Sequence, residues 1–249
     1  MSPSQPTPPL SAIFVLSAAA LAYEVLLVRL FSIIHWHHFA FMVISIALLG
    51  YGASGSMITV FQRGLLQRYG SVLVFNAAMF GLSAIVCFIA VQQLPFNALE
   101  ILWDTSQWQR LFLSYLLLTL PFFFVANAIA LTMARYSNRI AMVYGVDLIG
   151  AGTGAIAILV MLQFYPPDAV LRIIGVLGIV AGMLAVKHLA CLGRMLVSTF
   201  LALLTVIIIF APVDWFALHL SEYKGLEQVL LINGTEHLQR HSDSISQID

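Results

Sequence analysis

Two acidic residues lie inside long apolar segments, where a charge is costly and therefore informative. Glu24 lies near the middle of the apolar stretch 10–34, and Asp147 lies in the first half of the stretch 140–164. An acid at the centre of a membrane helix costs at least ~2.5–3.5 kcal/mol, so it faces the interior of the bundle and finds a partner. The two acids are expected at different depths, which argues against one site shared by both carboxylates.

Two interpretations of these acids stay open. Either they belong to a proton or substrate path, or each forms a structural pair with a neighbouring polar group. The candidate partners are Arg29 and Tyr23 for Glu24, and Arg139, Tyr144 and Asn127 for Asp147. The intramembrane polar candidates are therefore Glu24, Arg29, Asn127 and Asp147.

A dense histidine cluster follows the first apolar stretch. His35, His37 and His38 surround Trp36, and two or three imidazoles could bind a metal or an axial haem position. A buried haem needs facing histidines from two helices, and no other apolar stretch contains one. The pattern therefore favours a polar turn at the membrane interface with an aromatic anchor. No cofactor is predicted, and a metal at the three histidines stays the alternative.

Apolar helices must position these residues, because the composition excludes a water-soluble surface. Of the 249 residues, 61% are hydrophobic and 9% are charged, whereas a soluble domain is about one quarter charged. The formal net charge is +0, so no basic excess is present and a nucleic-acid partner is not expected. The sequence predicts an integral membrane protein.

Seven apolar runs are long enough to cross a bilayer core of about 30 Å as helices. They lie at 10–34, 38–61, 71–93, 110–134, 140–164, 169–187 and 193–212. The predicted fold class is an all-α polytopic membrane bundle of about seven transmembrane helices with a short C-terminal β-hairpin tail. The bundle covers 10–212, between a disordered leader at 1–9 and a soluble tail at 213–249.

Basic residues are confined to alternate connections between these runs. The second, fourth and sixth connections hold Arg63 and Arg68, Arg135 and Arg139, and Lys187 and Arg194, with no acid. The positive-inside rule therefore predicts a cytoplasmic N-terminus. After seven spans the tail is predicted to be periplasmic.

Glycines are concentrated in the second and fifth runs. Gly50, Gly52 and Gly55 match GxGxxG formally, but the motif lies inside an apolar run rather than between a strand and a helix, so a dinucleotide site is rejected. Gly150 and Gly154 form a GxxxG pair, which predicts close helix packing. Pro121 is predicted to kink the fourth run.

The composition changes after Pro212. The stretches 228–232 and 235–239 flank Asn233-Gly234, and an Asn-Gly pair between such stretches predicts a β-hairpin. The tail is therefore expected to open a soluble domain or to dock on a partner.

Three segments carry a family resemblance. They are AYEVLLVRLFSIIHWHHFAFMVISIALLGYGASGS, YGVDLIGAGTGA and SEYKGLEQVLLINGTEHLQRHSDSISQID. Together they resemble the N-terminal membrane domain of the bacterial, membrane-embedded spermidine synthase-like (polyamine aminopropyltransferase-like) proteins. The resemblance implies that the tail leads into an α/β domain of the S-adenosylmethionine type. That domain is expected to be encoded separately, lost or cut away, so no catalytic residue is carried over.

The resemblance makes a non-catalytic anchor or scaffold of a spermidine synthase-like system the leading hypothesis, in the bacterial inner membrane. One alternative is a transporter or exporter of small solutes, cationic solutes among them, which the intramembrane acids and the Gly-rich, Pro-kinked helices favour. Another is an accessory subunit of a respiratory or photosynthetic membrane complex, with a metal at the histidine cluster. The expected partners are the lipid bilayer and either other membrane subunits or a soluble domain docked on 213–249.

Overall fold

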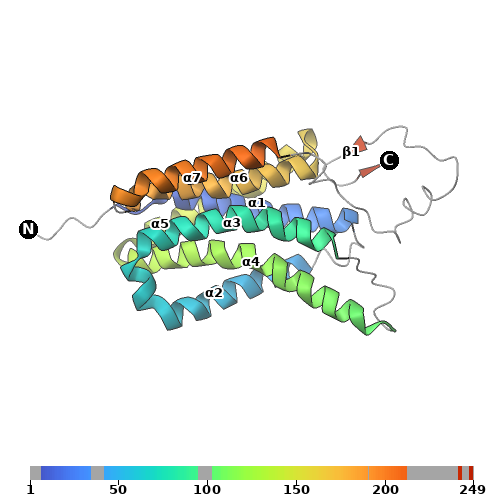
Figure 1. Cartoon of the computed structure of the whole chain (residues 1–249), viewed down its shortest axis with the longest axis horizontal. Coiled ribbons are helices and arrows are strands. Elements are labelled where there is room, and N and C mark those ends of the chain that lie inside the picture. Colours follow the sequence, from blue (N-terminus) through green and yellow to red (C-terminus); the bar gives the residue numbers. More distant parts are fainter. Residues whose placement is uncertain are drawn as a thin grey trace, which may run out of the picture.

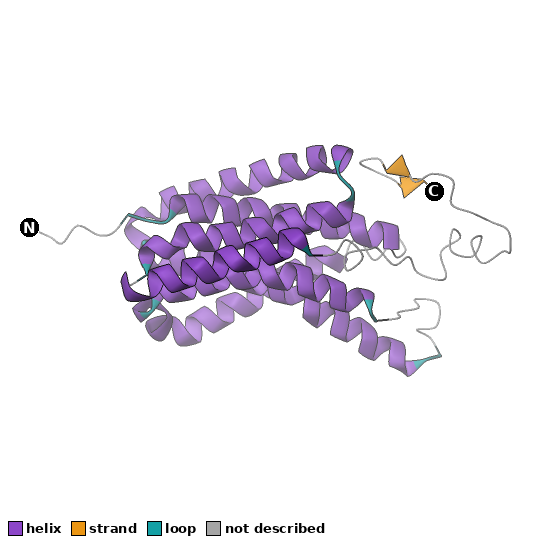
Figure 2. Cartoon of the chain, turned by 45° about the horizontal axis from the view of Figure 1, so that its top comes forward, coloured by secondary structure: helices purple, strands orange, loops and turns teal. Residues whose placement is uncertain are grey.

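Long helices that lie roughly along one common axis form most of the described part of the chain (Figure 1). The computed structural model describes residues 7–34, 42–94, 103–189, 191–211, 241–242 and 247–248. Figure 2 shows that helix accounts for almost all of these residues. The predicted histidine cluster at 35–38 and the predicted hairpin at 228–239 lie outside the described residues, so both stay predictions.

Seven α-helices are present in the described ranges, and each is long and apolar enough to cross a membrane. The chain is therefore a multi-pass membrane protein. The helices are α1 Leu10–Ile34, α2 Met42–Gln67, α3 Tyr69–Gln92, α4 Thr105–Arg135, α5 Ile140–Phe164, α6 Pro167–Ala185 and α7 Cys191–Phe210. Two 3₁₀ turns, η3 Ser137–Arg139 and η4 Val186–His188, precede α5 and α7. Two short strands, β1 His241–Ser242 and β2 Gln247–Ile248, pair antiparallel.

The helix bounds agree with the sequence analysis at α1 and α5 and differ at α2 and α4. The expected connection 62–70 is mostly helical. It contains no proline, so α2 continues beyond the apolar run as far as Gln67. Helix α4 begins five residues before the expected 110, because the Asp104 carboxylate caps it by accepting from the backbone N–H of Ser106 at 3.0 Å. The Ser106 hydroxyl also donates to this carboxylate, and these bonds hold the pKa of Asp104 below its usual range.

Successive helices alternate in direction, so the connections fall into two sets at opposite ends of the bundle (Figure 1). The α2–α3, α4–α5 and α6–α7 connections share one end, and these are the three connections that hold the basic residues. The beginning of α1 lies at the same end. One end of the bundle is therefore basic, as the sequence analysis expected.

Three of the closely packed helix pairs meet at glycines: α1 with α5, α2 with α4, and α3 with α6. Glycine allows each of these approaches. A Cβ atom on Gly150 of α5 would lie 2.6 Å from the carbonyl oxygen of Phe14, and one on Gly50 of α2 would lie 2.6 Å from Cβ of Phe122 in α4. A Cβ atom on Gly178 of α6 would lie 2.7 Å from Cα of Gly81 in α3. Each backbone therefore occupies space that a larger residue would need.

The three pairs are joined in a definite order. Helix α4 packs along α3 and helix α1 packs along α6, whereas α1 and α5 touch α2 and α4 only sparsely. The α1/α5 pair and the α2/α4 pair therefore form two arms that the central α3/α6 pair connects. Helix α7 lies against α6 at the outside of the bundle (Figure 1).

The glycine and proline predictions are largely confirmed. Gly50 lies in the middle of α2 and packs on α4, and Gly154 packs with Gly150 on α1, so neither motif forms a nucleotide loop. Gly52 and Gly55 face open space rather than a helix. Pro121 lies near the middle of α4. Figure 1 shows the first half of α4 leaning away from the direction of its second half.

A valine at Gly154 is predicted to destabilise the bundle by about 1–3 kcal/mol, the usual cost of overpacking. Its Cβ would meet the backbone of Ala18 in α1. Gly152 is the matched control, since it lies half a turn away and a Cβ there would meet nothing within 4 Å. Thermal unfolding in detergent gives the melting temperatures of both variants. Equal melting temperatures for Gly154→Val and Gly152→Val would contradict the close α1–α5 contact.

Candidate functional site

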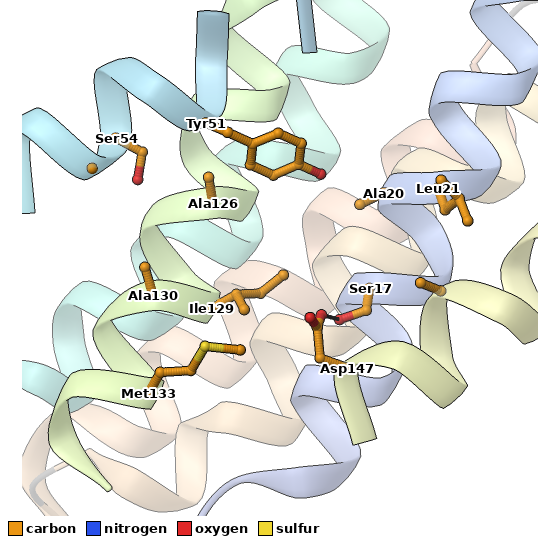
Figure 3. Close-up of a pocket in the computed structure, with 12 residues that line it drawn as sticks. Ser17, Ala20, Leu21, Tyr51, Ser54, Ala126, Ile129, Ala130, Met133 and Asp147 are labelled. Atoms are coloured by element: carbon orange, nitrogen blue, oxygen red, sulfur yellow. Dashed lines mark hydrogen bonds between the residues drawn. The ribbon is translucent and has the colours of Figure 1, made fainter. Parts of the chain in front are cut away.

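A cavity of about 380 Å³ lies between the two arms and is partly open to the surroundings of the bundle. Helices α1, α2, α4 and α5 all contribute to its wall (Figure 3). Most of the lining is small or apolar, and the polar groups come from three helices. The polar lining residues are Ser17, Tyr51, Ser54 and Asp147, and the others are Ala20, Leu21, Gly55, Ala126, Ile129, Ala130, Met133 and Ala151.

Asp147 is the acidic group of this cavity, and its carboxylate is fixed in place by α1. The Ser17 hydroxyl donates to Oδ1 of Asp147 at 2.5 Å (Figure 3). Ser17 is buried and Asp147 is half-buried, since the α1–α5 contact covers one side of the carboxylate. At 1.5 Å per residue, Asp147 lies about 10 Å along α5 from its beginning at Ile140.

The partner of Asp147 differs from those that the sequence suggested. Among the described residues its hydrogen bond comes from Ser17, and not from Arg139, Tyr144 or Asn127. The glycine pair on α5 explains why Ser17 is the partner, because it lets α5 pack closely on the α1 segment that contains Ser17. A serine inside an apolar run was the available signal, but the sequence does not indicate which helix it faces.

Asn127 belongs to the other arm. The Ser54 hydroxyl of α2 donates to Oδ1 of Asn127 in α4 at 2.9 Å, and both side chains are buried. Nδ2 of Asn127 also lies 3.8 Å from the sulfur of Met57. Asn127 therefore ties α2 to α4, while Ser54 also borders the cavity.

Tyr51 is a cavity residue that the sequence analysis missed. Its ring packs on Phe122 with centroids 6.4 Å apart, and its hydroxyl points from α2 toward α1 (Figure 3). A tyrosine beside Gly50 and Gly52 gave no separate signal, because its direction depends on how α2 packs against α4.

Glu24 lies outside the cavity lining but on the same face of α1. Ser17, Leu21 and Glu24 follow one another at intervals of four and three residues, which is the spacing of one helix face. Glu24 is half-buried, and the described residues provide no hydrogen-bond or ion-pair partner for it. The expected bond from Tyr23 is absent because that hydroxyl donates to the carbonyl oxygen of Ala84 in α3, at 3.3 Å. The expected pair with Arg29 is not observed either.

Arg29 and the histidine cluster do not join this cavity. Arg29 is buried one and a half turns beyond Glu24 in α1 and does not line the cavity. His35, His37 and His38 lie outside the described residues, so the metal alternative stays a prediction. Within the described ranges, no group of three His, Cys, Asp or Glu side chains could hold a metal ion.

Comparisons of the chain with family models, curated proteins and solved structures found no match. The resemblance to spermidine synthase-like membrane proteins therefore stays a prediction.

The cavity combines one carboxylate with hydroxyl groups and apolar walls. None of its lining residues is Lys, Arg or His, so the wall offers no counter-charge to Asp147. Such a site suits a small cation with an apolar body, because the carboxylate attracts the charge and the Tyr51 ring can add a cation–π contact. A volume of about 380 Å³ is within the range of small-ligand sites.

The Ser17–Asp147 hydrogen bond is predicted to couple α1 and α5 by about 0.6 kcal/mol and by no more than about 1.7 kcal/mol, as for other hydrogen bonds between membrane helices. A double-mutant cycle of Ser17→Ala and Asp147→Ala measures this coupling through reversible unfolding. The matched control pairs Ser17→Ala with Asp168→Ala, since Asp168 lies in the first turn of α6, away from the cavity. A coupling energy of zero for the first pair would show that the hydrogen bond contributes nothing.

Proposed function

We propose that this protein binds a small organic cation in the cavity between its two arms, as the binding step of a solute transporter. The observation that carries the proposal is the position of Asp147, a half-buried carboxylate within a membrane span that borders a partly open cavity with no basic lining residue. A structural acid would be expected in a closed contact, paired on all sides.

The remaining lining supports an organic rather than an inorganic cation. A bare metal ion prefers several oxygen ligands at short distances, whereas the cavity offers one carboxylate and a few hydroxyls spread over three helices. Its alanine, leucine, isoleucine and methionine side chains suit the methylene groups of an alkylammonium ion. Aliphatic amines and diamines are therefore the substrate class that the site favours.

The anchor hypothesis is the second candidate, and the family resemblance supports it. A membrane domain of a spermidine synthase-like system would hold a soluble domain on the tail at 213–249. The two roles are compatible, since polyamines belong to the class of cations proposed for the cavity. The accessory-subunit hypothesis depends on His35, His37 and His38, and none of the described residues adds support for it.

The proposed orientation places the basic end of the bundle in the cytoplasm of a bacterial cell, with the chain in the inner membrane. The N-terminus is then cytoplasmic and the tail periplasmic. Asp147 lies in the half of α5 nearer the basic end, so the cavity belongs to the cytoplasmic half of the membrane in this orientation.

Loss of the cavity carboxylate is predicted to weaken cation binding by about 10- to 100-fold. This range applies to methylammonium and 1,4-diaminobutane, whose N–H groups can donate to the carboxylate, whereas tetramethylammonium has no such donor. A hydrogen bond to a charged group contributes about 1.5–3 kcal/mol, and 1.4 kcal/mol corresponds to a factor of ten. Equilibrium dialysis of the protein in nanodiscs measures the dissociation constants of Asp147→Asn and of the wild type. The radiolabelled ligands are methylammonium, tetramethylammonium and 1,4-diaminobutane.

The matched control for this measurement is Asp168→Asn, which removes the same group from the first turn of α6. It is expected to bind the cations as the wild type does. Absence of saturable binding of all three cations to the wild type would overturn the proposed function. Equal affinity of Asp147→Asn and the wild type would do the same.

The orientation has its own test in single cysteines placed at opposite ends of the bundle. In a background of Cys87→Ser and Cys191→Ser, Gly64→Cys lies at the basic end and Tyr165→Cys lies at the other, and both positions are exposed. A membrane-impermeant maleimide applied to intact spheroplasts is expected to label only Tyr165→Cys. Labelling of Gly64→Cys alone would reverse the orientation.

A further inference from the structure

Glu24 continues the face of α1 that forms the cavity wall. Ser17 and Leu21 line the cavity, and Glu24 follows on the same face. Seven residues separate Ser17 from Glu24, which corresponds to about 10 Å along the helix axis. Asp147, which is hydrogen-bonded to Ser17, therefore lies at the level of the cavity, and Glu24 lies one level further along the same face of α1.

Tyr51 lies at the end of the cavity nearer Glu24. Figure 3 shows its ring at the level of Ala20 and Leu21, whereas Met133 borders the opposite end. The ring is supported from behind by Phe122, which also packs on Tyr23 of α1 at a centroid distance of 5.5 Å. An aromatic ring therefore borders the end of the cavity that is nearer the level of Glu24 on α1.

We propose that Glu24 is a second cation station, which receives the cation from Asp147 past the Tyr51 side chain. This inference rests on the proposed function, since it assumes that Asp147 binds the cation first. A cation that leaves Asp147 toward the middle of the membrane meets a largely apolar wall, and Glu24 supplies the next negative charge about 10 Å further along α1. Passage requires binding that is favourable enough for the cation to enter, and weak enough or divided among enough sites for it to leave.

The surroundings of Glu24 fit this role better than a structural one. It is half-buried, and no described side chain forms a hydrogen bond or ion pair with it. Ser17 and Tyr23, which precede it on α1, both direct their hydroxyls to other helices. A carboxylate kept in a membrane helix without such partners is available to an incoming cation.

Removing the charge of Glu24 and removing the charge of Asp147 are expected to have different effects. The test measures binding in nanodiscs and uptake into proteoliposomes, both with radiolabelled 1,4-diaminobutane and with the full chain. Glu24→Gln is expected to keep the dissociation constant within about threefold of the wild type, because Asp147 is intact, and to slow uptake at least tenfold. Asp147→Asn is expected to lose both binding and uptake.

Glu24→Asp is the matched control, since it keeps the carboxylate and is expected to retain most of the uptake. Melting temperatures of all variants identify any change that comes from misfolding. Uptake by Glu24→Gln at the wild-type rate would overturn the inference, as would loss of binding equal to that of Asp147→Asn. Binding without uptake by the wild type would also overturn it while the proposed binding function stands. Absence of binding to the wild type would instead refute the proposed function itself.

Discussion

Close approach of helix backbones through glycine is the constraint on which the rest of this structure depends. Lipid tails are as apolar as the helices, so the hydrophobic effect does not bring helices together inside a membrane, and tight packing must do so. Gly150 and Gly154 bring α5 onto α1, and Gly50 brings α2 onto α4. The α1–α5 contact also brings the Ser17 hydroxyl within hydrogen-bond distance of Asp147. Packing and site geometry are thus consequences of the same few glycines.

The cavity follows from how the pairs are joined. Each arm is held internally by a hydrogen bond between helices, Ser17 to Asp147 in one and Ser54 to Asn127 in the other. The arms connect to each other mainly through α3 and α6, so few contacts fill the space between them. Because the polar groups of both arms border that space, the gap carries a carboxylate and hydroxyls instead of apolar side chains alone. A packing defect between apolar helices would be lined by apolar side chains alone, and this difference supports the proposed binding site.

Much of the fold could be predicted from the sequence, and the bounds of α1 and α5 were. A run of apolar residues identifies a span, and the glycine pair on α5 identifies a contact face. The partners across each contact could not be predicted, since these helices are apolar on nearly every face and no periodic pattern shows which side turns inward. Ser17 and Tyr51 were missed for this reason. Asp147 and Glu24 were recognised because a charge in an apolar run needs no knowledge of its neighbours.

The most direct test of the central claim is an experimental structure in a lipid nanodisc, determined with and without 1,4-diaminobutane. A cavity between membrane helices can hold either a solute or a lipid chain, and the two have different density. A bound amine is expected to give density between the Asp147 carboxylate and the Tyr51 ring, present only in the structure determined with the amine. An acyl chain filling the cavity in both structures would contradict this expectation.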